Sequence, residues 1–401
     1  MRIDVRREDG PRTGTIRLTA HIRSREGERG VWFDVPRALE HDIALTAEPW
    51  LLLMLPLAAK TGEAIELTQP VDPLFMENVR ALVRTWASWY PDLKVPALRV
   101  PTAPASPSHP RGAQFFSGGV DSWFTLLRHT ESTPRFPQVG SVDDLITIWG
   151  FDIAIDQEGE FRYLEETVRE VAHNFGKRSI VVATNLREHM QGAWKDVWGP
   201  RWGPLTHGTG LAIVGLLLAR RHSVVRIAST HRFWEPFPYG SHPLTDTLFS
   251  TSATTFVHDH ALYSRAEKIE RIAESTYALS KLKVCYAEGR YRNCSQCVKC
   301  HRMLLCFDAL GILNQATSFD VALYQRNRHR TFLIRNENDL VRALEVRELA
   351  LAHGRNDIGD VVDESLRRSH RVGAMTAIVR PVSWRAWRAA HRRLAAGMIG
   401  A

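Results

Sequence analysis

Cysteine and long hydrophobic segments are both scarce in this sequence. Only five cysteines occur among 401 residues, and four of them lie within sixteen residues. This distribution favours a metal cluster in a reducing compartment over a disulfide framework. The longest apolar run, Trp50–Ala59, is interrupted by Pro56 and falls short of the about 20 residues that span a bilayer. Because the first nine residues are also too charged for a secretory signal, we expect a cytoplasmic protein with no membrane partner.

Lysine and a balancing number of acidic residues are missing from the last fifth of the chain. Residues 322–401 contain fifteen Arg, no Lys and eight Asp plus Glu, and their net charge of +7 is most of the +8 of the whole chain. An Arg-rich end of this kind favours contact with nucleic acid, an acidic protein or a phosphorylated ligand. A solvated helical surface explains it equally well.

The pattern of the chain predicts three regions and a linker. Residues 1–100 alternate strand-like and helix-like stretches and predict an N-terminal α+β domain. Its strands are expected at 15–23 and 31–35, and its helices at 48–60 and 72–90. A proline at every third position from Pro101 to Pro110 favours a stiff, extended linker over 101–113.

Residues 114–315 predict an α/β domain. Strands are expected at 114–116, 145–149, 179–183 and 224–228, and helices at 121–129, 160–175 and 211–220. This alternation favours a parallel sheet with helices on both faces, and ligands bind at the carboxyl edge of such sheets. Residues 316–401 should form an Arg-rich helical region, with helices at Asn338–His353 and Val382–Leu394.

A glycine-containing loop follows the first of these strands and opens a helix. Its members are Ser117, Gly118, Gly119, Val120, Asp121 and Ser122. The glycines let backbone N–H groups approach an anion closely, and the helix N-terminus adds free N–H groups and the positive end of its dipole. Asp121 is placed to hold Mg²⁺ on bound phosphates. The Gly-Lys-Ser/Thr ending of a Walker loop is missing.

The Ser-Gly-Gly-Val-Asp-Ser string resembles the loop of the PP-loop, or N-type, ATP pyrophosphatases, whose fold is of the adenine nucleotide alpha hydrolase-like type. This resemblance implies that ATP and Mg²⁺ are cofactors and that ATP is cleaved to AMP and pyrophosphate. A substrate oxygen would attack the α-phosphorus, and a nitrogen or sulfur nucleophile would then displace AMP.

Four cysteines predict a structural metal site. Cys285, Cys294, Cys297 and Cys300 are spaced so that four thiolates can surround one tetrahedral Zn²⁺ ion. An iron–sulfur cluster is the alternative. The fifth, Cys306, lies on an apolar helix and is expected to be a core residue.

Around these cysteines the sequence is similar to 7-cyano-7-deazaguanine synthase, a PP-loop ligase of queuosine biosynthesis. The similarity covers the Cys285-Tyr pair and the Cys294–Arg302 segment, and it extends to Ser264–Ile269. Arg265 would occupy the place of a lysine in that family. Independently, Arg265 and Lys268 lie one helical turn apart and could clamp pyrophosphate, or they could form an ordinary solvated helix face.

The substrate-recognition segments depart from that family. Trp149–Ile153 stands where the family has Tyr-Gly-Gln-Arg-His, and Thr206–Gly210 stands in place of its Pro-Gly-Arg-Asn element. Enlarged relatives in antiviral defence suggest amide attachment of a deazaguanine-type base to a partner protein. By resemblance, the acceptor is therefore a carboxylate of that type, joined to an amine or ammonia, with a protein substrate held by the N-terminal domain.

Further polar residues follow the later strands. Asp246 and His242 lie in a loop beyond 224–228 and are candidates for acceptor binding or general base. Asp152 and His207 are candidates at neighbouring strand ends, with helix capping by Thr206 or Thr209 as the alternative for the His207 segment. Trp194, Trp198 and Trp202 are spaced for one helical stripe, which usually packs in a core and can also stack on a base.

Three functions of different classes remain open at this point. The first is a ligase that adenylates a carboxylate and couples it to an amine. The second is a tRNA sulfur transferase, which usually needs a free cysteine or an open iron site. The third is a non-enzymatic nucleotide-binding scaffold.

Overall fold

The computed structural model describes residues 1–187, 192–235, 238–285 and 292–372. The chain divides into two compact units, Met1–Asn293 and Cys294–Ala401. No helix within these described ranges is long and apolar enough to cross a membrane.

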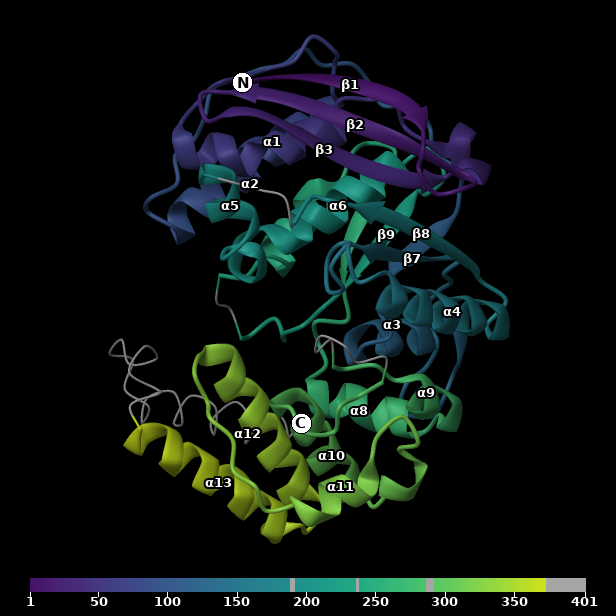
Figure 1. Cartoon of the computed structure of the whole chain (residues 1–401), viewed down its shortest axis with the longest axis vertical. Coiled ribbons are helices and arrows are strands. Elements are labelled where there is room, and N and C mark those ends of the chain that lie inside the picture. Colours follow the sequence, from purple (N-terminus) through teal and green to yellow (C-terminus); the bar gives the residue numbers. More distant parts are fainter. Residues whose placement is uncertain (188–191, 236–237, 286–291, 373–401) are drawn as a thin grey trace. The chain divides into compact units, whose positions relative to one another are not determined.

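The first unit is built on one mixed eight-stranded sheet (Figure 1). Its order is β1-β2-β3-β8-β7-β6-β9-β10. The strands are β1 (Arg2–Asp9), β2 (Thr15–Ser24), β3 (Gly27–Pro36), β6 (Gly112–Phe115), β7 (Asp144–Trp149), β8 (Arg178–Thr184), β9 (Val224–Ala228) and β10 (Thr255–Asp259). Strands β6 to β10 run parallel to one another, whereas β1, β2 and β3 pair antiparallel, and β3 joins β8 in the same antiparallel way. The predicted α/β class is confirmed.

The parallel strands create a point at which the chain reverses direction across the sheet. After β6 the chain builds β7 and β8 on one side, and it then returns to build β9 and β10 on the other side of β6. In open parallel sheets of this order, a crevice for ligands forms at the carboxyl ends of the two strands that flank the reversal. Here those strands are β6 and β9.

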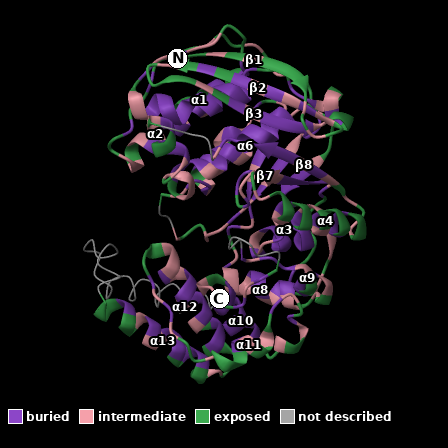
Figure 2. Cartoon of the chain, viewed as in Figure 1, coloured by how far each residue is buried: buried purple, intermediate pink, exposed green. Residues whose placement is uncertain are grey.

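Helices cover both faces of this sheet (Figure 1). On one face α3 (Val120–Thr130) packs against α8 (Arg265–Ala273), and α4 (Glu158–Asn174) lies on β7 and β8. On the other face α6 (His207–Leu217) packs against α1 (Glu48–Thr61). Nearly every residue of α1 is buried, which explains why this helix is apolar on all sides. Figure 2 shows the buried centre formed by α6 and the inner strands.

The N-terminal region differs from the separate domain that the proline pattern predicts. Its strands join the central sheet, because β3 pairs with β8 at Phe33–Thr184 and Asp34–Ala183. The edge of β8 would otherwise leave backbone groups unpaired. The predicted boundary at 101–113 therefore does not coincide with the division between the two compact units, which falls at Asn293.

The proline-rich segment is anchored to the first unit. The N–H group of Ala103 donates to the carbonyl of Val71, and the N–H of His109 donates to the carbonyl of Arg220. The N–H of Ala105 also donates to the carboxylate of Asp72 at 3.2 Å, which itself caps α2 (Pro73–Trp89). The extended conformation that the prolines favour serves here as a strap along the surface of the unit.

The second unit is helical where it is described. It contains α10 (Val298–Ala309), α11 (Val321–Arg326), α12 (Glu337–Ala352) and α13 (Asn356–Arg371). The predicted helix at 338–353 is confirmed as α12, whereas the one predicted at 382–394 lies outside the described residues. The carboxylate of Asp308 joins these helices, because it accepts hydrogen bonds from Tyr324 Oη at 2.9 Å and from Arg328 and Arg355.

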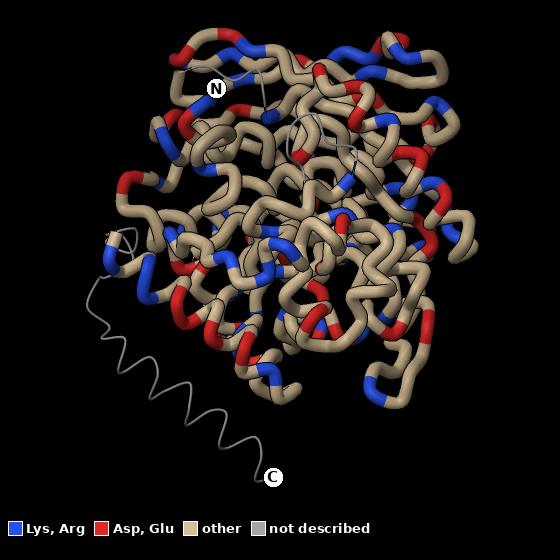
Figure 3. Tube along the Cα trace, turned by 60° about the horizontal axis from the view of Figure 1, so that its bottom comes forward, with Lys and Arg blue, Asp and Glu red and all other residues tan. Residues whose placement is uncertain are grey.

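The positive charge of the C-terminal region is unevenly distributed. Between 322 and 372 there are ten Arg and eight acidic residues, whereas 373–401 contains five Arg and no acidic residue. Several of the described arginines pair with acids, including Arg347 with Asp363 at 2.8 Å. Figure 3 shows the two signs interspersed along the described trace. Five of the seven excess positive charges therefore belong to residues 373–401.

Binding of nucleic acid to this end of the chain would show a distinctive salt dependence. Five arginines that neutralise phosphates give a logarithmic slope of about −4.5 against salt concentration on duplex DNA. We expect a chain ending at Val372 to lose that part of the slope. Fluorescence anisotropy with labelled RNA and DNA measures it, and undetectable or salt-insensitive binding of the full chain would instead support a solvated surface.

Candidate functional site

The predicted phosphate loop lies between β6 and α3. Gly118 adopts a φ of +76°, a left-handed conformation that favours glycine, and its carbonyl accepts a hydrogen bond from the N–H of Lys283 at 2.8 Å. Gly119 is the N-cap of α3 and has no side chain to occupy the free N–H groups of the first turn. Ser122 Oγ donates to the Gly119 carbonyl at 3.0 Å. The loop can therefore offer an anion several N–H groups and the positive end of the helix.

Three of the predicted catalytic residues meet at the start of α3. The carboxylate of Asp121 forms ion pairs with the guanidinium of Arg265 and, at 3.4 Å, with Lys268 Nζ. Both cations come from α8, whose start is fixed by a capping box between Ser264 and Glu267. The three residues are thus brought together from positions 144 and 147 apart in the sequence.

The two cations of α8 differ in how firmly they are held. The side chain of Lys268 is only 1% exposed, and its Nζ donates to the carbonyl and hydroxyl of Ser229 at 2.5 and 2.9 Å. A buried charge needs such partners to offset its desolvation. The side chain of Arg265 is 28% exposed. Lys268 is therefore a fixed charge beside Asp121, whereas Arg265 is partly open to solvent.

A cavity of about 240 Å³ opens beside this group. It lies at the carboxyl ends of β6, β7 and β9, the place that the strand order predicts for a ligand. Its apolar lining consists of Phe115, Phe116, Ile146, Ile148, Phe151, Ile153, Leu164, Trp202, Leu211, Ile227 and Ala228. Its polar lining consists of Ser117, Asp121, Ser122, Thr147, Asp152, His207 and Thr230. Apolar walls with a few polar groups at one end suit a planar ring attached to a charged group.

The start of α6 forms another wall of the cavity. A Cβ atom at Gly210 would lie 2.9 Å from the ring of Trp202 and 3.1 Å from that of Phe151, so glycine lets these two rings approach the helix. They pack edge to face, with centroids 4.5 Å apart. Helix capping by Thr206 or Thr209 is not observed, since α6 has no side-chain cap.

His207 contributes a neutral imidazole to the cavity. Burial lowers its pKa, and the nearby charge of Asp246 offsets this only in part. Its Nδ1 atom lies 3.2 Å from the carbonyl of Gly203, which holds the ring in place. The expected stripe of three tryptophans is confirmed in part. Trp194 and Trp198 are buried on α5 (Ala193–Trp198), whereas Trp202 begins a separate element, η2 (Trp202–Thr206), and lines the cavity.

Asp246 does not line the cavity. Its carboxylate has no exposed surface and accepts hydrogen bonds from Ser241 Oγ at 2.6 Å, the N–H of His242 at 3.1 Å and His258 Nδ1 at 2.7 Å. The predicted contact between Asp246 and an acceptor therefore has no support in this geometry. His242 caps α7 (Pro243–Asp246) through its Nδ1 atom. The role that the geometry gives Asp246 is to hold this loop behind His207.

The four predicted cysteine ligands form a cluster that can bind a metal ion such as zinc. Their sulfur atoms all lie within 4.8 Å of one another, and Cys294 Sγ and Cys300 Sγ are 3.8 Å apart. Sulfurs at about 2.3 Å from one tetrahedral ion stand about 3.8 Å apart. Cysteines that bind different irons of a larger cluster stand further apart, so this spacing favours a single ion.

Backbone N–H groups donate hydrogen bonds to two of these sulfur atoms and so stabilise them as thiolates. The N–H of Cys297 donates to Cys294 Sγ at 3.2 Å, and the N–H of Cys300 donates to Cys297 Sγ at 3.5 Å. Cys297 is also the N-cap of α10, where the helix dipole stabilises a thiolate. Asn293 Oδ1 accepts from the N–H groups of Val284 and Cys285 and so fixes the backbone that carries the first ligand.

Known proteins do not add to this picture. Comparison with protein families, with curated proteins and with solved structures finds no match for the chain. The similarity to 7-cyano-7-deazaguanine synthase is confined to short motifs and remains a prediction.

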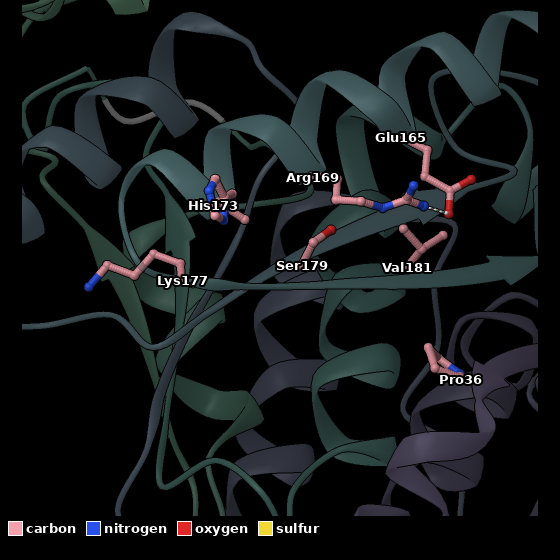
Figure 4. A pocket seen from close by; sticks show the side chains of 8 residues that line it. Pro36, Glu165, Arg169, His173, Lys177, Ser179 and Val181 are labelled. Atoms are coloured by element: carbon pink, nitrogen blue, oxygen red, sulfur yellow. Dashed lines mark hydrogen bonds and ion pairs between the residues drawn. The ribbon is translucent and has the colours of Figure 1, made fainter.

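A second hollow lies between α4 and the sheet (Figure 4). It is lined by Pro36, Glu165, Arg169, Ala172, His173, Lys177, Ser179 and Val181. Figure 4 shows the ion pair between Arg169 and Glu165, whose atoms are 3.2 Å apart. This hollow contains none of the predicted site residues, so it is a weaker candidate than the cavity at the phosphate loop.

Sequence reasoning missed three contributors to the site. Ser229 anchors Lys268, Lys283 closes the phosphate loop from behind, and Phe151 packs against Trp202. Their roles come from backbone positions and packing, for which the local sequence carries no signal. Sequence reasoning also missed His258, Asp259 and His260. Three consecutive residues that can bind metals or transfer protons were a signal that could have found them.

Proposed function

We propose that the first unit is an ATP-dependent ligase of the PP-loop type, which cleaves ATP to AMP and pyrophosphate. The observation that carries this proposal is the meeting of Asp121, Arg265 and Lys268 at a glycine-containing helix N-terminus beside an apolar cavity. An anion-binding backbone, two cations and a carboxylate form a set that suits a triphosphate with Mg²⁺. The neighbouring apolar walls suit the adenine ring and an acceptor.

The residues divide the chemical work in a simple way. The loop N–H groups bind phosphate oxygens, and Arg265 neutralises charge that develops on the departing pyrophosphate. Asp121 fits a role in holding Mg²⁺, since it lines the cavity next to the loop that would bind the phosphates. Bound there, Mg²⁺ would neutralise phosphate charge. A carboxylate oxygen of the acceptor attacks the α-phosphorus, the bond to the β-phosphate oxygen breaks, and pyrophosphate leaves.

The second step forms the amide bond. An amine or ammonia attacks the acyl adenylate, loses a proton and expels AMP. The neutral imidazole of His207 is the cavity group best suited to accept that proton. The sequence suggests Asp246 as the general base. His207 takes that role in this proposal, because the carboxylate of Asp246 is fully buried and does not line the cavity.

The acceptor that we propose is a carboxylate of a 7-deazaguanine-type base. Trp202 and Phe151 line the cavity with aromatic rings, and Asp152, another lining residue, can accept hydrogen bonds from ring and exocyclic N–H groups. The amine donor would be ammonia or a partner protein, in line with the resemblance to antiviral-defence relatives. Sulfur transfer is less well supported, because Cys306, the cysteine outside the metal cluster, is buried on α10.

Product analysis tests the reaction class. Incubation with ATP, Mg²⁺ and a carboxylated deazaguanine should release AMP and pyrophosphate in equal amounts, and only when the acceptor is present. A scaffold would bind ATP without turnover.

Arg265 gives a quantitative prediction. The Arg265→Ala change should lower kcat by about 10²-fold, because a preorganised charge at the leaving group is lost. Arg265→Lys should recover part of that loss, since lysine keeps the positive charge but lacks the paired N–H donors of the guanidinium group. Rapid-quench assays measure the effect. Arg162→Ala is the matched control, because Arg162 is exposed on α4 and pairs with Glu158 one turn away; equal rates in both alanine variants would contradict the role.

A further inference from the structure

A second group of metal-ligand side chains lies in the first unit, away from the cysteines. His129 comes from the last turn of α3, and Asp259 and His260 come from the end of β10. Each offers one ligand atom, and these atoms lie within 4.8 Å of one another. None of the three lines the cavity of the proposed ligase. The sequence separates His129 from the other two by 130 residues or more, so the fold creates this group.

Two of the distances within the group match those between ligands of one metal ion. His129 Nε2 and His260 Nε2 lie 3.0 and 3.3 Å from the same oxygen, Asp259 Oδ2. Donor atoms at about 2.1 Å from an ion stand about 3.0 Å apart in an octahedral site and about 3.4 Å apart in a tetrahedral one. His260 Nε2 is buried and makes no hydrogen bond to the described residues, so the proximity of His260 to Asp259 is not explained by such a bond.

The surroundings hold His260 in an unusual position. Its φ is +62°, a left-handed conformation that costs energy in a non-glycine residue and persists where the surroundings impose it, commonly at functional sites. The ring packs edge-on against Phe124, with centroids 5.3 Å apart, and lies near Tyr263. These aromatic rings keep water from much of the group.

The donor set and the nearby charges restrict which ion fits. Two imidazoles and one carboxylate suit Zn²⁺, Fe²⁺, Co²⁺ and similar ions, whereas Mg²⁺ and Ca²⁺ prefer oxygen donors. Arg128, Arg226 and Lys268 lie near enough to act on the charges of this group. These positive side chains repel any cation at the site. They therefore disfavour metal ions that are held mainly by charge and favour those that bind imidazole nitrogen strongly.

We propose that His129, Asp259 and His260 form a binding site for one divalent first-row transition-metal ion. Three protein ligands leave at least one position for water or another small ligand. The ion would join the end of α3 to the β10–α8 connection. That connection leads to Ser264, the N-cap of α8, and the backbone of Asp259 also accepts a hydrogen bond from Ser229, the anchor of Lys268. The site would therefore stiffen the elements that hold Asp121, Arg265 and Lys268 together.

Cobalt loading of the full chain tests this proposal. Chain that retains zinc in its cysteine cluster should take up about one further equivalent of Co²⁺. The bound cobalt should show visible d–d bands without the near-ultraviolet thiolate-to-metal band that a cysteine site gives. His260→Asn and His129→Gln should each abolish this uptake. Asparagine tolerates the left-handed backbone, and glutamine keeps a donor for Asp259, so both variants should melt like the parent before cobalt is added.

His21→Ala is the matched control, because His21 lies exposed on β2, and it should bind cobalt normally. Three results would each overturn the proposal. The parent chain could take up no further equivalent of Co²⁺, both the His129 and His260 variants could take up as much as the parent, or the His21 control could lose uptake. If the His129 or His260 variant fails to fold, X-ray absorption spectroscopy of the cobalt-loaded parent chain identifies the ligand atoms instead. Imidazole neighbours without sulfur support the site, and sulfur neighbours contradict it.

Discussion

Asp121→Asn should abolish formation of AMP and pyrophosphate while the chain remains folded. Asparagine has nearly the same shape, but it removes the negative charge that faces Arg265 and Lys268 and that is placed to hold Mg²⁺. We expect kcat to fall by about 10³-fold or more, since both metal positioning and the balance of charges at the phosphates are lost.

The fold should tolerate this change because Lys268 keeps its two hydrogen bonds to Ser229. A cost in the free energy of unfolding of about 1–3 kcal/mol is expected from the lost ion pair. Thermal melting and single-turnover assays separate the two effects. Asp156→Asn is the matched control, since Asp156 is exposed and does not line the cavity. Full activity of Asp121→Asn would remove Asp121 from the mechanism.

Cys297→Ser should cost the chain its metal and unfold the second unit. Cys297 is both a member of the cysteine cluster and the N-cap of α10, the helix on which Tyr324, Arg328 and Arg355 converge through Asp308. Binding of a structural zinc ion supplies about 10–16 kcal/mol at neutral pH, which is comparable to the whole stability of a domain. Zinc removal by a strong chelator should have the same effect.

Elemental analysis and circular dichroism measure this outcome. The parent chain should contain about one zinc in the cluster and no iron. Cys306→Ala is the matched control, because Cys306 is buried on the same helix but outside the cluster; it should keep its zinc and lose only about 1–2 kcal/mol. A folded, metal-free Cys297→Ser chain would contradict a structural role, and stoichiometric iron with visible absorption would contradict the choice of metal.

Local patterns predict most of the elements in the first unit. The apolar run at 50–59 becomes α1, and the four strands expected between 114 and 228 are confirmed as β6, β7, β8 and β9. Strands β1 and β10 were missed. The first is an exposed edge strand with charges along its length, and the second is only five residues long and ends in a histidine and an aspartate. Both gain their stability from neighbouring strands, which a local window does not contain.

The joining of the N-terminal strands to the central sheet could not be predicted. It depends on the pairing of Phe33 with Thr184, residues whose separation in sequence leaves no periodic signal. The proline-rich segment had the composition of a linker because prolines favour an extended chain in any setting. Whether that chain is free or lies against a surface is decided by acceptors such as the Val71 carbonyl and Asp72.

For the candidate site, sequence motifs identified the charged residues but did not show which of their side chains are buried. Asp121, Arg265 and Lys268, each singled out from a local pattern, lie together in the structure, because a strand-loop-helix motif and a helical spacing fix which way each side chain points. Asp246 was expected at the ligand because it follows a strand. A turn and the partner His258 direct it inward instead, and a loop sequence does not reveal that direction. His207, on the preceding helix, takes the place at the cavity.

The nucleotide products of turnover test the central claim most directly. The purified full chain, incubated with ATP, Mg²⁺ and an acceptor carboxylate, should yield AMP and pyrophosphate, because the loop holds the outer phosphates and exposes the α-phosphorus to attack. Ion-exchange chromatography separates AMP from ADP, and a coupled assay distinguishes pyrophosphate from phosphate. Release of AMP and pyrophosphate that requires the acceptor and disappears in Asp121→Asn is the predicted result. ADP and phosphate as the sole products would contradict the assignment.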